Sequence, residues 1–135
     1  MNREDQIHTW VEEHTEELTE TADFIFRHPE LSKEEVISSA HLAFYLEANG
    51  FRITKGIADL PTAFAAEWGS GKPILGFLAE YDALPGLGQE PVCTHQPLRT
   101  PGHGCGHNLL GTACAGAACA LKERMEAEHF SGTIR

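Results

Sequence analysis

Residues 74–82 read ILGFLAEYD, a nearly continuous apolar run that ends in two carboxylates. Such runs are typical of a strand that is buried on both faces of a sheet, so we expect a central strand here. Two further runs, 51–57 and 62–68, carry β-branched and aromatic residues between glycine and proline breaks, and they are also expected to be strands. The glycine-rich segment 69–73 is expected to form a hairpin-type turn before the central strand.

Two helical patterns precede these strands. Apolar residues recur every three or four positions over residues 5–27, which predicts one amphipathic helix that ends at Pro29. Ser32 and Glu35 form a capping-box pattern, which predicts a second helix that stops at Asn49. The apolar face of this second helix is expected to include Val36, Ala40, Ala43 and Phe44.

A third helix and a further strand are expected after a long loop. Residues 83–106 contain four prolines and no periodic pattern, and long loops of this kind are often functional. The helix should run over 109–128, and its small residues at 111–120 imply close packing, most simply against a sheet. Residues 132–135 open another strand. Helices that alternate with strands predict an α/β layer architecture.

Composition excludes several classes of protein. The chain has 135 residues, 41% of them hydrophobic and 22% charged, which is typical of a globular domain with one core. No window approaches the roughly 18 consecutive apolar residues of a membrane helix, so we expect no membrane as a partner. The polar, acidic start resembles neither a signal peptide nor a transit peptide, so we expect the protein to be cytoplasmic. A net charge of −10 argues against nucleic acid as a partner. The four cysteines are expected to be free thiols.

The segment 102–111, GHGCGHNLLG, is rich in groups that bind metals. Cys105 and His107 offer a thiolate and an imidazole, which suit zinc and similar ions. In an extended segment these two residues would point the same way and could face one metal. Asn108 is expected to cap the following helix. A lone Cys-x-His pattern also occurs without metal, so this segment by itself leaves metal binding open.

Two carboxylates end the expected central strand, where α/β proteins usually place their sites. Alternation along the strand puts Glu80 and Asp82 on the same side. They could bind a metal directly or hold a ligand histidine by a hydrogen bond, and equally they could be solvated residues at a strand end.

Taken together, three segments resemble the M20 family of metallopeptidases and amidohydrolases. They are HPEL at 28–31, EYDALPG at 80–86 and GHGCGHNLLGT at 102–112, and they keep the order of the family. The match is closest to the branch of aminobenzoyl-glutamate hydrolases, aminoacylases and dipeptidases. It covers essentially the whole chain but only the first third of a typical member. The resemblance implies that 1–135 is the N-terminal portion of a two-metal aminopeptidase- or carboxypeptidase-like catalytic domain, without the lid domain used for dimerisation.

The resemblance also implies roles for particular residues. Cys105 and His107 match metal ligands for two divalent ions, zinc or manganese, in the complete enzyme. Asp82 matches a supporting aspartate near the metals. Glu80 stands where other branches carry a histidine ligand, which leaves its coordination open. The general-base glutamate is expected beyond Arg135, so the chain itself would hold no catalytic acid or base.

Two functions follow as hypotheses. In the first, the parent enzyme hydrolyses amide bonds in N-acyl or N-aminobenzoyl amino acids or dipeptides with a metal-activated water, and it forms a homo-oligomer. The chain alone is then expected to be inactive. In the second, the chain is a truncated, non-catalytic remnant that self-associates and binds metal weakly, because two protein ligands make a poor zinc site.

Overall fold

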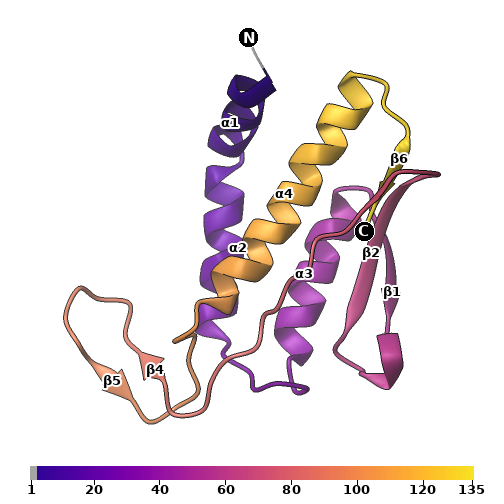
Figure 1. Cartoon of the computed structure of the whole chain (residues 1–135). Helices are drawn as coiled ribbons and strands as arrows, with labels where there is room; N and C mark the ends of the chain where they lie inside the picture. The colour runs from indigo at the N-terminus through magenta and orange to yellow at the C-terminus, as the bar shows by residue number, and fades with distance from the viewer. Residues whose placement is uncertain (1–2) are drawn as a thin grey trace.

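The computed structural model describes residues 3–135, which form helices packed on a mixed sheet (Figure 1). The helices are α1 (Arg3–Glu13), α2 (Thr15–Arg27), α3 (Val36–Ala48) and α4 (His107–Ala127), with a short 3-10 helix η1 (Ile57–Asp59). The main strands are β1 (Arg52–Lys55), β2 (Phe64–Ser70), β3 (Ile74–Leu75) and β6 (Gly132–Ile134), and a small hairpin is formed by β4 (Gly88–Gln89) and β5 (Pro97–Leu98). The predicted α/β class is confirmed.

The sheet has the order β1-β2-β6-β3. β2 is antiparallel to both of its neighbours, whereas β6 and β3 are parallel. The predicted hairpin between β2 and β3 is therefore wrong, because the C-terminal strand β6 lies between them. The predicted central strand is also much shorter than expected. Only Ile74 and Leu75 pair as a strand, and residues 76–80 continue as an extended segment that is mostly exposed.

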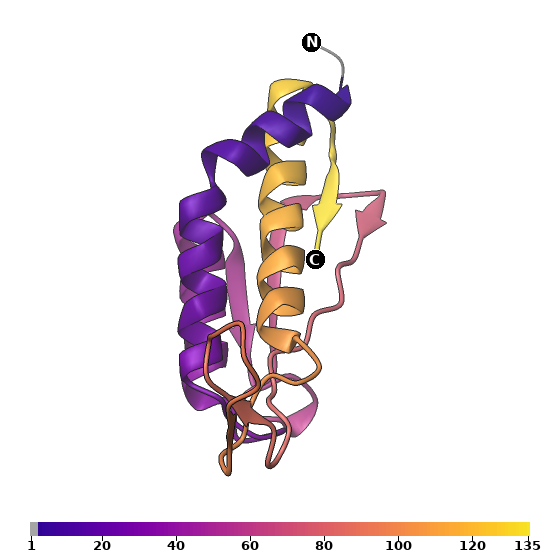
Figure 2. The ribbon, with the colours of Figure 1, turned by 90° about the vertical axis from the view of Figure 1, so that its left-hand side faces the viewer.

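The first helical pattern forms two helices instead of one. The break falls at His14, and Figure 2 shows α1 leaning away from the axis of α2. Two side chains here bond to backbone carbonyls one turn earlier: the Thr15 hydroxyl donates to Val11 O at 2.7 Å, and His14 Nδ1 lies 2.7 Å from Trp10 O. Side chains that bond back to the preceding turn often bend helices. The predicted end of the pattern before Pro29 is confirmed.

A glutamate that precedes α3 caps this helix, and the predicted capping box is not formed. Both carboxylate oxygens of Glu30 accept hydrogen bonds from the first turn, from Ile37 N at 2.9 Å and Ser38 N at 2.8 Å. Glu35 instead accepts from Lys33 N and from the Thr62 hydroxyl, at 2.8 and 2.6 Å. The predicted apolar face is also partly wrong. The buried side chains are Ser38, Leu42, Ala43, Tyr45 and Leu46, whereas Val36, Ala40 and Phe44 are exposed.

The longest helix, α4, packs mainly against other helices and not against a sheet as expected. A Cβ added at Gly116 would lie 2.9 Å from Leu18 of α2, and one at Gly111 would lie 2.9 Å from the backbone oxygen of Glu80 and 3.1 Å from Leu42 of α3. The small residues of α4 therefore allow α2, α3 and the extended segment to approach closely. Within residues 3–135 no helix is long and apolar enough to span a membrane.

The core lies between the helices and one face of the sheet. Its most buried large side chains are Ile25 of α2 and Ile134 of β6, both with no exposed surface. Other members come from every layer: Trp10, Leu42, Tyr45, Leu46, Phe51, Ala115, Ala118, Cys119, Ala120 and Met125. Cys119 is also buried, and burial raises the pKa of its thiol to about 11. The thiol therefore stays protonated at neutral pH.

We expect the chain to lose stability as the pH falls below 6.5, in part because of His41. Its ring stacks on Phe24 at 4.0 Å, and its Nε2 is buried without a hydrogen-bond partner in the part of the chain that the structure describes. Burial, and next the charge of nearby His28, lower the pKa of His41 below its usual 6.5. Below that pH the unfolded chain binds a proton that the folded chain excludes, so protons favour unfolding.

The measurement is urea unfolding at pH 7.5 and pH 5, for the chain and for His41→Phe. Because phenylalanine cannot be protonated, the variant should lose less stability between the two pH values than the chain does. An equal loss in both proteins would contradict a contribution from His41.

Candidate metal site

Backbone contacts bring the three distinctive sequence segments to one end of the molecule. Ala83 N donates to Glu30 O at 2.7 Å, which joins the segment after α2 to the end of the extended segment 76–82. Leu84 and Gly102 then exchange two backbone hydrogen bonds, of 2.9 and 3.0 Å. The loop before α4 is thereby held beside Asp82. The segments 28–31, 80–86 and 102–112 are thus neighbours in space.

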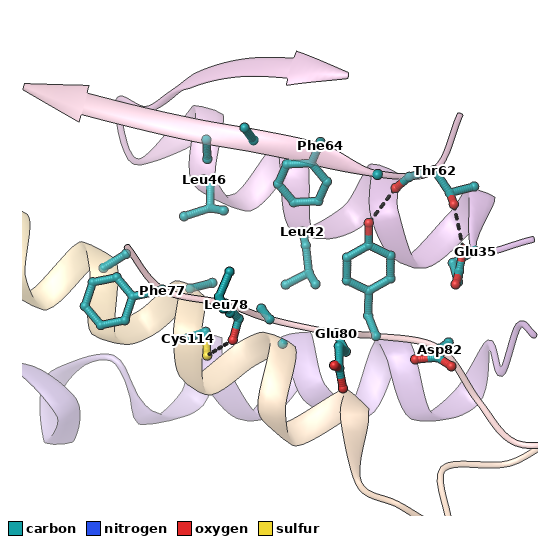
Figure 3. A pocket seen from close by; sticks show the side chains of 18 of the residues that line it. Glu35, Leu42, Leu46, Thr62, Phe64, Phe77, Leu78, Glu80, Asp82 and Cys114 are labelled. Atoms are coloured by element: carbon teal, nitrogen blue, oxygen red, sulfur yellow. Dashed lines mark hydrogen bonds between the residues drawn. The ribbon is translucent and has the colours of Figure 1, made fainter. Parts of the chain in front are cut away.

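His107, the first residue of α4, lies between two carboxylates. Its Nδ1 is 2.7 Å from Asp82 Oδ1, and its Nε2 is 3.1 Å from Glu80 Oε2. The side chains of His107 and Asp82 are largely shielded, with 16% and 23% of their surface exposed, whereas Glu80 is 64% exposed. Glu80 and Asp82 therefore lie on the same side of the extended segment, as alternation predicted. Figure 3 shows both carboxylates at the end of this segment, near the start of α4.

The short contact with Asp82 fixes the role of each ring nitrogen. A carboxylate accepts hydrogen bonds, so the partner of Asp82 is the protonated Nδ1. In the neutral ring, Nε2 then carries the lone pair and faces Glu80. Nε2 and Glu80 Oε2, which lie 3.1 Å apart, are both groups that can coordinate a metal ion. A histidine held by a carboxylate in this way is the usual arrangement for metal-binding imidazoles.

Cys105 is placed differently from the prediction. It is exposed, in a turn, and Gly106 adopts the left-handed conformation with φ 80° before the helix begins at His107. The segment is therefore not extended, and the predicted common direction of Cys105 and His107 does not follow from its backbone. Among residues 4–135, no three histidine, cysteine, aspartate or glutamate side chains are grouped so that they could hold a metal ion. The imidazole of His107 and the thiol of Cys105 are suitable metal-binding groups, but the described residues do not group three such side chains around one ion.

Asn108 anchors the site instead of capping the helix. It is buried inside the first turn of α4, and its side-chain amide donates to Ala22 O of α2 at 3.3 Å. The N-cap position is occupied by Gly106, so the predicted cap at Asn108 is wrong. The hydrogen bond ties the start of α4 to α2. His107 is thereby held at a fixed position relative to the helices.

Of the other two histidines in this region, only His103 lies close to the site. Its ring is half-buried and faces Phe26, with centroids 6.5 Å apart. Burial lowers the pKa of His103 below 6.5, so the ring is neutral at neutral pH. His95 is exposed between β4 and β5.

Sequence reasoning underestimated two glutamates. The contact between Glu80 and His107 Nε2 was left open, although the alternation that places Asp82 near the helix also places Glu80 there. The role of Glu30 was missed entirely. The only signal for it was its place in the segment 28–31, in the loop between α2 and α3.

The chain is similar to known hydrolases along most of its length. It is 46% identical over 128 residues to a subunit of p-aminobenzoyl-glutamate hydrolase from Escherichia coli K12, an alignment that covers 93% of this chain and 27% of that protein. It is 33% identical over 129 residues to human Xaa-Arg dipeptidase, covering 86% of this chain and 26% of that protein. No family model matches the chain.

A solved structure of a metal-binding peptidase is also similar to the chain. A dinuclear metal-binding peptidase of the M20 family from Bacillus subtilis superposes with a TM-score of 0.72 at 28% identity, over 90% of this chain and 33% of that structure. The chain is therefore similar, in sequence and in fold, to one part of an M20-family peptidase. The family is enzymatic, and its members named above are hydrolases or peptidases. The chain spans about a quarter of the length of the curated relatives that it matches.

Proposed function

We propose that the chain supplies part of a metal-dependent centre that hydrolyses amide bonds in N-acyl or N-aminobenzoyl amino acids or in dipeptides. The observation that carries this proposal is the pairing of His107 with Asp82, which leaves Nε2 available on the side of Glu80. The names of the relatives support the substrate class, since one is an aminobenzoyl-glutamate hydrolase and another a dipeptidase. The Bacillus relative, described as dinuclear, supports the use of two metal ions.

Each residue of the site has a distinct role in this proposal. His107 and Cys105 would hold divalent ions, zinc or manganese, through nitrogen and sulfur. Asp82 holds the His107 ring in one orientation and keeps the proton on Nδ1. When bound, the metal would acidify water and polarise the amide carbonyl. The general base is expected from a glutamate outside these 135 residues, as are the remaining ligands.

The activity is tested with the full-length product of the gene. Hydrolysis of an N-acyl amino acid, an aminobenzoyl-glutamate and a dipeptide is measured with and without a chelator. We expect hydrolysis of at least one substrate, lost with the chelator and restored by zinc or manganese. Hydrolysis that persists without metal would contradict the proposed chemistry.

A truncated remnant without activity is the second candidate. It is favoured by the absence of any group of three metal-binding side chains among residues 4–135. Such a chain would bind metal weakly and would associate with itself through unpaired strand edges. The gene discriminates the two candidates: a stop codon after codon 135 supports the remnant, and a Glu-Glu pair encoded shortly downstream supports the enzyme.

We expect zinc to protect Cys105 from alkylation. In the metal-free chain Cys105 is exposed and should react readily, whereas Cys114 is half-buried and Cys119 is buried. Coordination by zinc would occupy the thiolate and slow its reaction. The measurement is mass-spectrometric mapping of the labelled cysteines with and without zinc.

Cys93 is a matched control within the same chain, because it is also exposed but lies in the β4–β5 hairpin. Its labelling should not change with zinc. If zinc leaves Cys105 unprotected, or slows Cys93 by the same factor, Cys105 is not a ligand. Faster labelling of Cys114 than of Cys105 would contradict the placement of both residues.

A further inference from the structure

Tyr81 lies between the two carboxylates of the candidate site, and its side chain points away from them. Alternation along the extended segment places Glu80 and Asp82 beside His107, so the residue between them projects from the opposite face. The ring of Tyr81 is half-buried and stacks on Phe64 of β2, with the two ring centroids 6.0 Å apart. Tyr81 therefore joins the segment that carries the carboxylates to the sheet.

The Tyr81 hydroxyl is anchored by a short chain of hydrogen bonds. It donates to Thr62 O at 2.5 Å, and the hydroxyl of the same threonine donates to Glu35 Oε2 at 2.6 Å. Glu35 is buried, and its other carboxylate oxygen accepts from Lys33 N at 2.8 Å. Figure 3 shows Thr62 and Glu35, joined by a dashed line, across a pocket from Glu80. The chain of hydrogen bonds thus ties the extended segment to the loops that precede β2 and α3.

This anchor leaves the Tyr81 side chain little freedom. Burial, and next the charge of Glu35, raise the pKa of Tyr81 to about 12, so its hydroxyl keeps its proton at neutral pH and can donate it. The acceptor is a backbone oxygen, and Thr62 lies in a turn closed by the hydrogen bond from Ala63 N to Leu60 O at 3.0 Å. The position of this acceptor therefore depends on the main chain and not on a side-chain rotamer.

The helix that carries His107 contacts the backbone of the same segment. A Cβ added at Gly111, one turn further along α4, would lie 2.9 Å from Glu80 O and 3.6 Å from Tyr81 Cβ. The segment can approach α4 this closely because glycine has no side chain. Rotation of the segment about its own axis would break its contact with α4, its anchor at Thr62, or both. Such a rotation would also carry Asp82 away from His107.

We propose that Tyr81 is a positioning residue of the metal site, whose hydrogen bond to Thr62 O sets the rotation of residues 80–82 and so holds Asp82 against His107 Nδ1. Groups that orient a ligand histidine through a hydrogen bond usually change metal affinity. Tyr81 acts one step further out, through the backbone that it shares with Asp82. The inference rests on the proposed function for the use of a metal, but the pairing of Asp82 with His107 can be measured without one.

The test compares Tyr81→Phe with Tyr45→Phe, a matched pair because the chain has two tyrosines. Each change removes one hydroxyl and keeps the ring. Tyr45 is a core residue of α3, and its hydroxyl takes no part in the anchor at Thr62. Exchange of the His107 Nδ1 proton with water is measured by NMR of the metal-free protein, and zinc affinity is measured by competition with a chromophoric chelator. Urea unfolding gives the stability of the chain and of both variants.

We expect Tyr81→Phe to accelerate exchange of the His107 Nδ1 proton and to weaken zinc binding by about 2- to 10-fold, the range of one hydrogen bond. Tyr45→Phe should leave both quantities unchanged, whatever it does to stability. A hydroxyl that only stabilised the fold would change the unfolding midpoint alone. The proposal is overturned if Tyr81→Phe leaves the proton exchange unchanged, or if Tyr45→Phe accelerates it equally.

The two measurements separate this inference from the proposed function. If neither the chain nor its variants bind zinc, the proposed metal centre is contradicted. Faster exchange of the Nδ1 proton in Tyr81→Phe alone would still support the positioning of Asp82 by Tyr81. If the chain binds zinc and Tyr81→Phe binds it equally well with an unchanged proton, the metal centre stands and the role of Tyr81 is wrong.

Discussion

Asp82→Asn is expected to weaken the binding of Zn²⁺ to the chain by about 10- to 100-fold. Asp82 accepts the hydrogen bond from His107 Nδ1 at 2.7 Å and thereby leaves Nε2 free for a metal. An asparagine of the same shape accepts more weakly, and its NH₂ group can turn toward the ring and favour a proton on Nε2. Zinc affinity is measured by competition with a chromophoric chelator.

Asp59→Asn is the matched control, because Asp59 is exposed in η1 and has no contact with His107 in the structure. This variant should bind zinc as tightly as the unchanged chain. Equal affinities for Asp82→Asn and the unchanged chain would mean that the hydrogen bond to Asp82 does not prepare His107 for a metal.

Ile25→Ala is expected to destabilise the chain by about 2–5 kcal/mol. Ile25 has no exposed surface, and it belongs to the core cluster that joins α2 to α3 and α4. Removal of its outer carbons leaves a cavity that helices packed through small residues cannot easily close. Because native domains are stable by only about 5–15 kcal/mol, this loss is a large share of the total.

Ile7→Ala, on α1, is the corresponding change at a position that is 47% exposed, and it should cost about 0.5 kcal/mol or less. Urea unfolding followed by circular dichroism gives both values. Similar losses for the two variants would contradict the placement of the core between α2, α3 and α4.

Elements that depend on local patterns were predictable from the sequence. The helix predicted over 109–128 is observed as α4, and the strand predicted at 132–135 is observed as β6. The break at His14 was not predictable from periodicity, because the apolar spacing continues through it while side chains bond to the preceding turn. Pairing between distant segments was also missed. Nothing in residues 62–80 indicates that β6 will separate β2 from β3.

In the candidate site, too, features set by the local backbone were predictable, and contacts between distant segments were not. Strand alternation correctly placed Glu80 and Asp82 on one side, because that rule depends only on the local backbone. The expected common direction of Cys105 and His107 rested on an extended backbone, and the left-handed conformation of Gly106 between them removes that basis. The meeting of Asp82 with His107 required the backbone pairing of Leu84 with Gly102, which no local pattern contains.

The most direct test of the metal site is nitrogen NMR of the His107 ring during a zinc titration. The geometry predicts that Nε2 binds the metal while Nδ1 keeps its proton and its hydrogen bond to Asp82. The Nε2 resonance should therefore move to the position of a metal-bound nitrogen, and the Nδ1 resonance should stay that of a protonated nitrogen. Coordination through Nδ1, or unchanged resonances of both nitrogens at saturating zinc, would contradict the metal site.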